Sequence, residues 1–171
     1  MPFKEETKSK NIVYKGKILN LRSDDVILPD GKETKREIVE HKGGSAVLVE
    51  KDGKILFVKQ FRYAYKKELL EIPAGKLDEG EDPMVTARRE LEEECGIIAD
   101  MEFIREVYPS PGYTEEIIRI YKAKNLSIGK VNLDEEEFLS SVWIEKEKVR
   151  KMVKDGEIRD AKTLIALMEI L

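Results

Sequence analysis

The sequence predicts a mixed α/β fold, an α/β/α sandwich preceded by a small N-terminal antiparallel β-sheet. Three observations support this fold class. Strand-like runs separated by glycine turns fill the first part of the chain, a strongly capped helix follows them, and two helical segments end the sequence. Strands mixed with a central helix and terminal helices are typical of a layered sandwich.

Residues 11–50 alternate strand-like runs with turns. The runs IVYKGKILNLRSDDVILP and ETKREIVEH are separated by the turn Asp30-Gly31, and Gly43-Gly44 precedes the apolar run SAVLVE. Turns of this kind join antiparallel neighbours. Because the two glycines interrupt the pattern, we expect residues 1–43 to form a separate β-sheet subdomain and residues 44–171 to form the main domain.

A helix is predicted between Asp82 and Gly96. Asp82 is suited to the N-cap and Pro83 to the first helical position, where a missing N–H costs nothing. Gly96 is a suitable stop. Apolar residues at helical spacing predict a buried stripe; they are Met84, Ala87, Leu91 and Cys95.

The second half of the chain predicts two strands, a third strand and two helices. MEFIREVYP and IIRIYKAKNL are expected to be strands joined by the loop SPGYTEE, and an acidic segment precedes a strand with Trp143. EKEKVRKMVKDG and DAKTLIALMEIL are expected to be helical. The broad apolar face of the last helix consists of Ala161, Leu164, Ile165, Leu167, Met168 and Leu171.

Composition indicates a globular chain with an ionic surface. Its 171 residues are 41% hydrophobic and 39% charged, with a net charge of −4, which argues against a nucleic-acid-binding surface. The start, MPFKEETKSK, lacks a hydrophobic signal region and no apolar run approaches membrane-spanning length, so we expect a cytoplasmic protein. Cys95 cannot form an internal disulfide, and His41 is expected to be a packed or surface residue.

Three carboxylates are expected to share one face of the central helix. Glu90, Glu93 and Glu94 follow each other at helical spacing, and like charges held about 4 Å apart near a protein surface repel by roughly 4 kcal/mol per pair. Arg89 can pair with Glu93 but cannot neutralise the group. A solvated acidic face is the alternative, yet the capping, the spacing and Gly75 favour a divalent cation, with Mg²⁺ as the default.

The segment from Gly75 to Ile97 fits the pattern G-x5-E-x7-R-E-U-x-E-E-x-G-U at every fixed position, where U is a bulky aliphatic residue. The chain therefore resembles the Nudix hydrolases. The resemblance implies the α/β/α sandwich and the hydrolysis of a nucleoside diphosphate linked to another group. REIVEH, VKQFRYA, LLEIPAG, SPGYTEE and DAKTLIAL, with Pro109 or Pro111 beyond the motif, resemble the ADP-ribose pyrophosphatase branch.

The resemblance also implies roles for the motif residues. Metal ions, Mg²⁺ with Mn²⁺ as a substitute, would be held by the backbone carbonyl of Ala74 and by the carboxylates of Glu90, Glu93 and Glu94. Arg89 would orient Glu93 through a charge-assisted hydrogen bond. Glu81 is expected to support the loop and the helix start.

Substrate-binding residues are expected outside the motif. Arg62, at the end of a predicted strand, is suited to a forked contact with a phosphate. The resemblance implies that Arg36 and Glu37 hold the adenine base, often from a neighbouring subunit. Glu116 would bind a terminal ribose hydroxyl, and adjacent Glu115 could take that role.

A general base is expected in the acidic segment before the last strand. The resemblance selects Glu137, and Glu135 and Glu136 remain open because a run of acids cannot fix its own register. Related enzymes often have another glutamate in the strand where this chain has Ser140.

The sequence therefore predicts Mg²⁺-dependent hydrolysis of ADP-ribose to AMP and ribose 5-phosphate. A broader nucleoside diphosphate sugar hydrolase is the alternative within the class, and a catalytically silent nucleotide-binding module is the alternative outside it. The expected partners are a small-molecule nucleotide and a second copy of the chain in a homodimer formed by the N-terminal strands, with no nucleic acid and no membrane.

Overall fold

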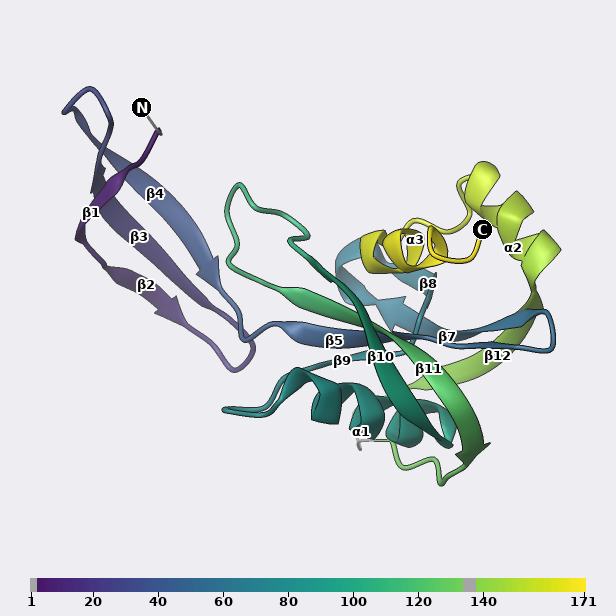
Figure 1. The fold of residues 1–171 in the computed structure, drawn as a ribbon. Helices are drawn as coiled ribbons and strands as arrows, with labels where there is room; N and C mark the ends of the chain where they lie inside the picture. The colour runs from purple at the N-terminus through teal and green to yellow at the C-terminus, as the bar shows by residue number, and fades with distance from the viewer. Residues whose placement is uncertain (1–2, 134–137) are drawn as a thin grey trace. The chain divides into compact units, whose positions relative to one another are not determined.

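A computed structural model describes residues 3–133 and 138–171 (Figure 1). The chain forms two compact units. The smaller unit consists of Met1–Gly43 and Tyr108–Ile117, and the larger unit of Gly44–Val107 and Ile118–Leu171. The division after Gly43 coincides with the glycine pair of the sequence, and the short segment from Tyr108 joins the first unit.

The smaller unit contains an antiparallel sheet built around β3 (Asn20–Ile27). One edge of β3 pairs along its whole length with β4 (Glu33–Glu40). The other edge pairs with β1 (Glu6–Ser9) and β2 (Ile12–Lys15). The separate N-terminal antiparallel sheet expected from the sequence is therefore confirmed.

The larger unit contains two four-stranded sheets. In the first, the strands follow the order β10-β11-β5-β9, and the central pair of β11 and β5 is parallel. The second is built on β7, which pairs with β12, β6 and β8. The bounds are β5 (Gly44–Leu48), β6 (Glu50–Lys51), β7 (Lys54–Arg62), β8 (Lys67–Glu71), β9 (Ala74–Lys76), β10 (Ile97–Val107), β11 (Ile118–Ile128) and β12 (Leu139–Glu145).

Helices cover both faces of these sheets (Figure 1). They are α1 (Pro83–Cys95), α2 (Lys146–Lys154) and α3 (Ala161–Leu167), and a short 3₁₀ turn spans Tyr63–Tyr65. Ala46 on β5 belongs to the core cluster that includes Leu167 of α3, whereas its neighbour Val47 belongs to the cluster that includes Leu91 of α1. Since successive strand residues face opposite sides, α1 lies on one face and α2 and α3 lie on the other, as the predicted sandwich requires.

The last helix is shorter than the sequence predicted. α3 ends at Leu167, and Met168, expected on its apolar face, is 72% exposed. The backbone tightens there, because Glu169 N–H donates to Ala166 and Ile170 N–H to Leu167, three residues back. The regular α-helix therefore stops one turn earlier than predicted, and Met168 is not part of a buried face.

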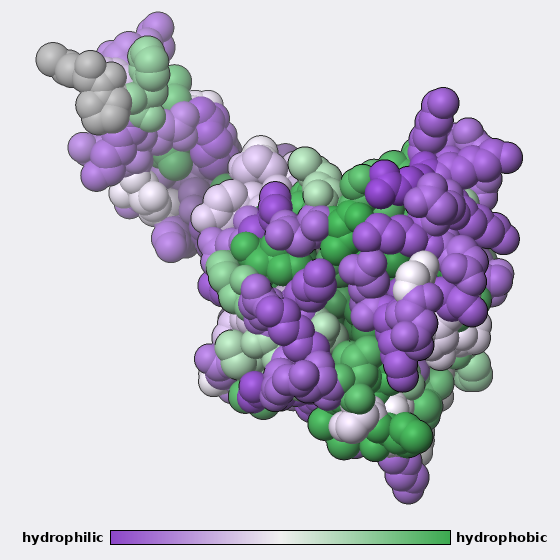
Figure 2. Space-filling view, turned by 45° about the vertical axis from the view of Figure 1, so that its right-hand side comes forward, coloured by the Kyte–Doolittle hydropathy of each residue, from purple (hydrophilic) through white to green (hydrophobic). Residues whose placement is uncertain are grey.

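The visible surface is dominated by hydrophilic side chains, with hydrophobic ones between them (Figure 2). This agrees with the charged fraction of 39% in the sequence. Within residues 3–133 and 138–171, no helix is both long enough and apolar enough to cross a membrane.

Candidate active site

The glutamates of the motif are displayed by α1, whose ends are fixed locally. The Asp82 carboxylate accepts hydrogen bonds from the backbone N–H groups of Met84 (2.8 Å) and Val85 (3.4 Å), and Pro83 is the first helical residue. At the other end Gly96 adopts a left-handed conformation, with φ 63°, that a residue with a side chain would resist. The helix therefore begins and ends where the sequence predicted.

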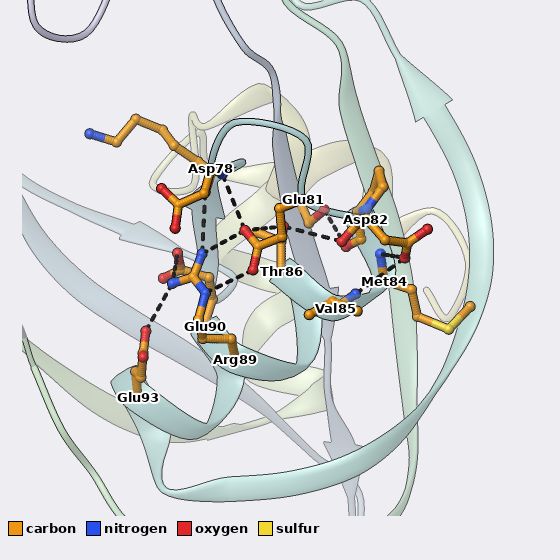
Figure 3. Close-up of polar contacts among 12 residues, drawn as sticks. Asp78, Glu81, Asp82, Met84, Val85, Thr86, Arg89, Glu90 and Glu93 are labelled. Atoms are coloured by element: carbon orange, nitrogen blue, oxygen red, sulfur yellow. Dashed lines mark hydrogen bonds and ion pairs between the residues drawn. The ribbon is translucent and has the colours of Figure 1, made fainter.

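Arg89 connects three carboxylates of the motif (Figure 3). Its Nη1 donates to Glu90 Oε1 (2.8 Å) and to Glu93 Oε2 (3.0 Å). Its Nε and Nη2 donate to the two oxygens of Glu81, each at 3.1 Å. Nη2 also reaches the carbonyl of Lys76 (3.4 Å), so that every N–H of the guanidinium has an acceptor.

Glu81 ties the loop before α1 to the helix. Besides Arg89, its carboxylate accepts hydrogen bonds from the Thr86 hydroxyl (2.8 Å) and from the backbone N–H of Asp78 (3.1 Å). The Arg89 guanidinium is the main cause that lowers the pKa of Glu81 to about 2. Glu81 thus supports the loop and the helix start, which is the role expected from the sequence.

Glu90 and Glu94 lie against the backbone of β9. Glu90 is 8% exposed, and a Cβ added to Gly75 would overlap its carboxylate. Glu94 is 4% exposed, and its Oε2 accepts a hydrogen bond from the backbone N–H of Ala74 (3.1 Å). Gly75 is therefore required by the space that Glu90 occupies.

The structure brings together the side chains predicted to hold metal. Glu90 and Glu94 contact the Ala74-Gly75 backbone, and Arg89 links Glu93 to Glu90. In the described part of the chain, no three acidic, histidine or cysteine side chains already surround a common point suited to an ion. Carboxylates and a backbone carbonyl are nevertheless the hard oxygen donors that fit a divalent cation, and a single guanidinium leaves the group strongly negative.

Arg62, the predicted phosphate ligand, is the last residue of β7 and makes a two-pronged ion pair with Glu71. Its Nε donates to Glu71 Oε1 (2.6 Å) and its Nη2 to Glu71 Oε2 (2.7 Å). The hydrogen bonds to Glu71 raise the pKa of Arg62, and the charges of Asp160 and Glu94 act in the same direction. Arg62 therefore lies within electrostatic reach of Glu94 on α1.

Two charged residues of this neighbourhood were missed by the sequence analysis. Glu71 is only 2% exposed, and its Oε2 also accepts a hydrogen bond from Lys162 on α3, which is 9% exposed. Burial opposes ionisation of Glu71, yet Arg62 and Lys162 lower its pKa to about 2. The available signal was a lone charge inside each of the apolar runs LLEIPA and AKTLIAL, which indicates a buried charge with a partner.

Three of the predicted substrate residues lie in the smaller unit. Arg36 on β4 donates hydrogen bonds to both carboxylate oxygens of Glu5, from Nη2 to Oε1 and from Nε to Oε2 (2.9 Å). Glu37, the next residue, is exposed. Glu116 lies beside His41, with Oε1 3.4 Å from Nδ1, and His41 Nδ1 accepts a hydrogen bond from the backbone N–H of Gly43.

The remaining residues singled out in the sequence lie in different parts of the chain. Glu115, the alternative to Glu116, contacts Arg22 at 3.4 Å. Ser140 lies on β12, opposite Lys59 of β7. The acidic run that holds Glu137, with the alternatives Glu135 and Glu136, lies outside the described residues.

Comparison with known proteins decides the family. Residues 39–167 match the NUDIX domain, and residues 5–39 match the nucleoside diphosphate sugar hydrolase N-terminal domain. The chain belongs to the Nudix family. It is a Nudix hydrolase, and enzymes of this family generally need divalent metal ions, in agreement with the oxygen donors gathered by α1 and β9.

Known proteins resemble this one along at least 90% of their own length. An ADP-ribose pyrophosphatase of Bacillus subtilis (strain 168) is 46% identical over 167 residues, which is 95% of this chain and 90% of the relative. A methanol dehydrogenase activator of Bacillus methanolicus is 43% identical over 169 residues, 96% and 91% of the two chains. The crystal structure of an ADP compounds hydrolase has the same fold, with a TM-score of 0.84 at 22% identity, covering 96% of this chain and 91% of the other.

Proposed function

We propose that this Nudix hydrolase cleaves the diphosphate bond of ADP-ribose in the presence of Mg²⁺ and releases AMP and ribose 5-phosphate. The observation that carries the proposal is the joining of Ala74, Glu90 and Glu94 at one place, with Glu93 attached to it through Arg89. The similarity to an ADP-ribose pyrophosphatase over 95% of the chain supports the choice of substrate.

The metal would be held by the carbonyl of Ala74 and by Glu90, Glu93 and Glu94. Their oxygen donors suit Mg²⁺, and Mn²⁺ could replace it. When bound, the ion neutralises charge on the diphosphate and lowers the pKa of a coordinated water. For Glu93, the hydrogen bond from Arg89 Nη1 (3.0 Å) restricts the orientation in which its carboxylate is presented.

The reaction needs a water placed in line with one phosphorus. The water oxygen forms a bond to phosphorus, the bond to the bridging oxygen breaks, and that oxygen leaves with the other phosphate. Glu137 is proposed to accept the proton of the water, with Glu135 and Glu136 as the alternatives. Arg62 is proposed to contact the diphosphate through the donors that Glu71 does not use.

Binding of the nucleoside is proposed to depend on residues of the smaller unit. Arg36 and Glu37 would hold adenine, and Glu116 would accept a hydrogen bond from the terminal ribose. In a homodimer the strands of residues 1–43 would pack across the interface, so that a second subunit supplies the adenine ligands. The proposed location is the cytoplasm, where nucleotide substrates occur, and neither nucleic acid nor membrane is a proposed partner.

A substrate panel tests the specific claim. Purified protein is incubated under Mg²⁺ with ADP-ribose, ADP-glucose, GDP-mannose, UDP-glucose, NADH and diadenosine polyphosphates. We expect ADP-ribose to have the highest kcat/KM. ADP-ribose among the poorest substrates would reject this substrate while leaving the hydrolase intact.

Glu94→Gln tests the metal assignment. The variant removes the charge of a proposed metal ligand with little change in side-chain volume. We expect kcat to fall by at least about 100-fold because the metal ion is bound less tightly. Glu147→Gln, on the exposed surface of α2, is the control and should keep the wild-type rate. Turnover near the wild-type value in Glu94→Gln would refute the assignment.

Glu137→Gln separately tests the base. We expect a large loss of kcat with little change in substrate binding, because proton transfer typically contributes about 100- to 10,000-fold. An unchanged rate would transfer the role to a neighbouring acid of the run.

A broader nucleoside diphosphate sugar hydrolase is the second candidate. The match of residues 5–39 to the N-terminal domain of nucleoside diphosphate sugar hydrolases favours it. Similar kcat/KM values for several sugars in the panel would select this function over the narrower one.

A further inference from the structure

The second and third residues of α3, Lys162 and Thr163, contact the end of β8 and the residue that follows it in the larger unit. Lys162 Nζ donates to Glu71 Oε2 and contacts Asp160 Oδ1 at 3.0 Å. The Thr163 hydroxyl accepts a hydrogen bond from the backbone N–H of Ile72 (2.9 Å) and donates to Asp160 Oδ2 (2.6 Å). Since Ala74 follows Ile72 by two residues, α3 holds the segment that leads directly to the proposed metal ligand.

Glu71 is shared between two cations of unequal exposure. The Glu71 side chain is 2% exposed and the Lys162 side chain 10%, whereas that of Arg62 is 41% exposed. A buried carboxylate needs compensating charge, and Lys162 supplies it from the protein interior. Arg62 is the partner that also faces solvent, where a ligand can reach it.

Arg62 keeps donors for a ligand while it is oriented by Glu71. Its Nε and Nη2 each give one N–H to Glu71, and a guanidinium has five N–H donors in a rigid plane. Three N–H groups are therefore not used by Glu71. Because the two-pronged contact fixes the plane of the guanidinium, it also fixes the direction of these three donors.

The balance of charge depends on Lys162. Arg62 and Lys162 carry two positive charges, and Glu71 and Asp160 carry two negative ones. Without Lys162, Arg62 would be the one remaining cation of this group to compensate the carboxylates of Glu71 and Asp160. Both carboxylates already raise the pKa of Arg62. Arg62 would then be less available to an anion, and Glu71 would lose one of the contacts that set its orientation.

We propose that Lys162 is a positioning residue for diphosphate binding, which acts by holding Glu71 so that Glu71 presents Arg62 to the phosphates. The proposal rests on the proposed function, in which Arg62 contacts the diphosphate. In this proposal the start of α3 contributes to substrate affinity. A purely structural ion pair would instead affect the stability of the fold and leave the contact between Arg62 and substrate unchanged.

A double-mutant cycle separates these two roles. Lys162→Met, Arg62→Ala and the double variant are compared with wild type under saturating Mg²⁺, and Lys148→Met on exposed α2 is the matched control. Lys162→Met is expected to raise KM about tenfold, the size of one weakened charge-assisted hydrogen bond, with a smaller change in kcat. In the Arg62→Ala background the same change should alter KM less than about twofold, because residues that act through each other are not additive.

Two further variants keep the test decisive. Lys162→Arg retains charge and donors and should recover most of the affinity, and Lys162→Gln replaces Lys162→Met in the cycle if the methionine variant does not fold. Independent, multiplicative effects of the two sites on KM would overturn the proposal, as would a lowered Tm with unchanged KM. The cycle uses whichever panel substrate the wild type cleaves best, so its outcome does not depend on ADP-ribose being that substrate.

Discussion

At the scale of single residues, the site depends on one absent side chain. The carboxylate of Glu90 lies where a Cβ of residue 75 would be, so the backbone of β9 and the acidic face of α1 approach closely only because Gly75 has no side chain. The close approach places Glu90 against Gly75, the residue after Ala74, whose carbonyl is another proposed ligand of the metal.

Gly75→Ala should therefore impair metal binding. The added methyl group displaces Glu90. Loss of ligand orientation typically lowers the affinity for a metal ion by on the order of 10- to 100-fold. The Mg²⁺ concentration that gives half-maximal rate measures the effect. Gly112→Ala, where a Cβ would meet nothing within 4 Å, is the control, and an unchanged Mg²⁺ requirement in folded Gly75→Ala would contradict the prediction.

The acid stability of the protein should depend on Glu71. Its pKa is lowered from an ordinary value of 4.5 to about 2, so the folded state binds its proton less readily than the unfolded state. The stability that the Glu71 charge contributes is complete above about pH 4.5 and is lost as the pH falls toward 2. Glu71→Gln should be less stable at neutral pH and should lose stability more gradually across this window.

Urea unfolding between pH 7 and pH 2.5 measures this dependence. Glu147→Gln, whose side chain is 86% exposed, should follow the wild-type curve. A Glu71→Gln curve parallel to wild type would show that the ionisation of Glu71 is not linked to folding.

At the scale of secondary-structure elements, α1 is fixed by signals within a few residues. Asp82, Pro83 and Gly96 act on their own neighbours in the chain, which is why the bounds of α1 were predictable from the sequence. The end of α3 was not, because no such stop follows Leu167 and the backbone tightens there instead. The contact between Glu71 and Lys162 joins positions 91 residues apart, and local patterns contain no information about such a pair.

Asp82→Ala should destabilise the protein by about 1 kcal/mol. The variant removes the carboxylate that accepts the first N–H groups of α1, and loss of an N-cap usually costs this much. Urea denaturation gives the difference in the free energy of unfolding. Glu79→Ala, at an exposed position of the same loop, should change stability by less than about 0.5 kcal/mol. Equal effects of the two substitutions would exclude the cap as the cause.

At the scale of the whole molecule, the fold class was predictable because it follows from the order of elements, whereas the residues proposed as substrate ligands belong to two different units. Arg36, Glu37 and Glu116 belong to the smaller unit, and the proposed metal ligands and Arg62 belong to the larger one. The sequence pattern that identifies the motif in α1 covers the larger unit alone. The roles proposed for residues of the smaller unit rest instead on the resemblance to related enzymes.

Light scattering tests the homodimer. We expect a mass twice that of one chain at micromolar concentration, because the short N-terminal strands expose apolar side chains such as Val13 (64%) and Tyr14 (56%). A monomer under these conditions would remove the neighbouring subunit from the proposed adenine site and with it the roles of Arg36 and Glu37.

The pairing of the strands in the larger unit also determines when, during synthesis, its two sheets can fold. β5 pairs with β11 through Gly44 and Ile118, and β7 pairs with β12 through Lys54 and Glu145. During synthesis neither sheet can be completed until the strand from the second half has left the ribosome, and such distant pairing makes folding slow. The acidic helix therefore emerges before the sheets that it will cover are complete, and the nascent chain depends on its last third to become an enzyme.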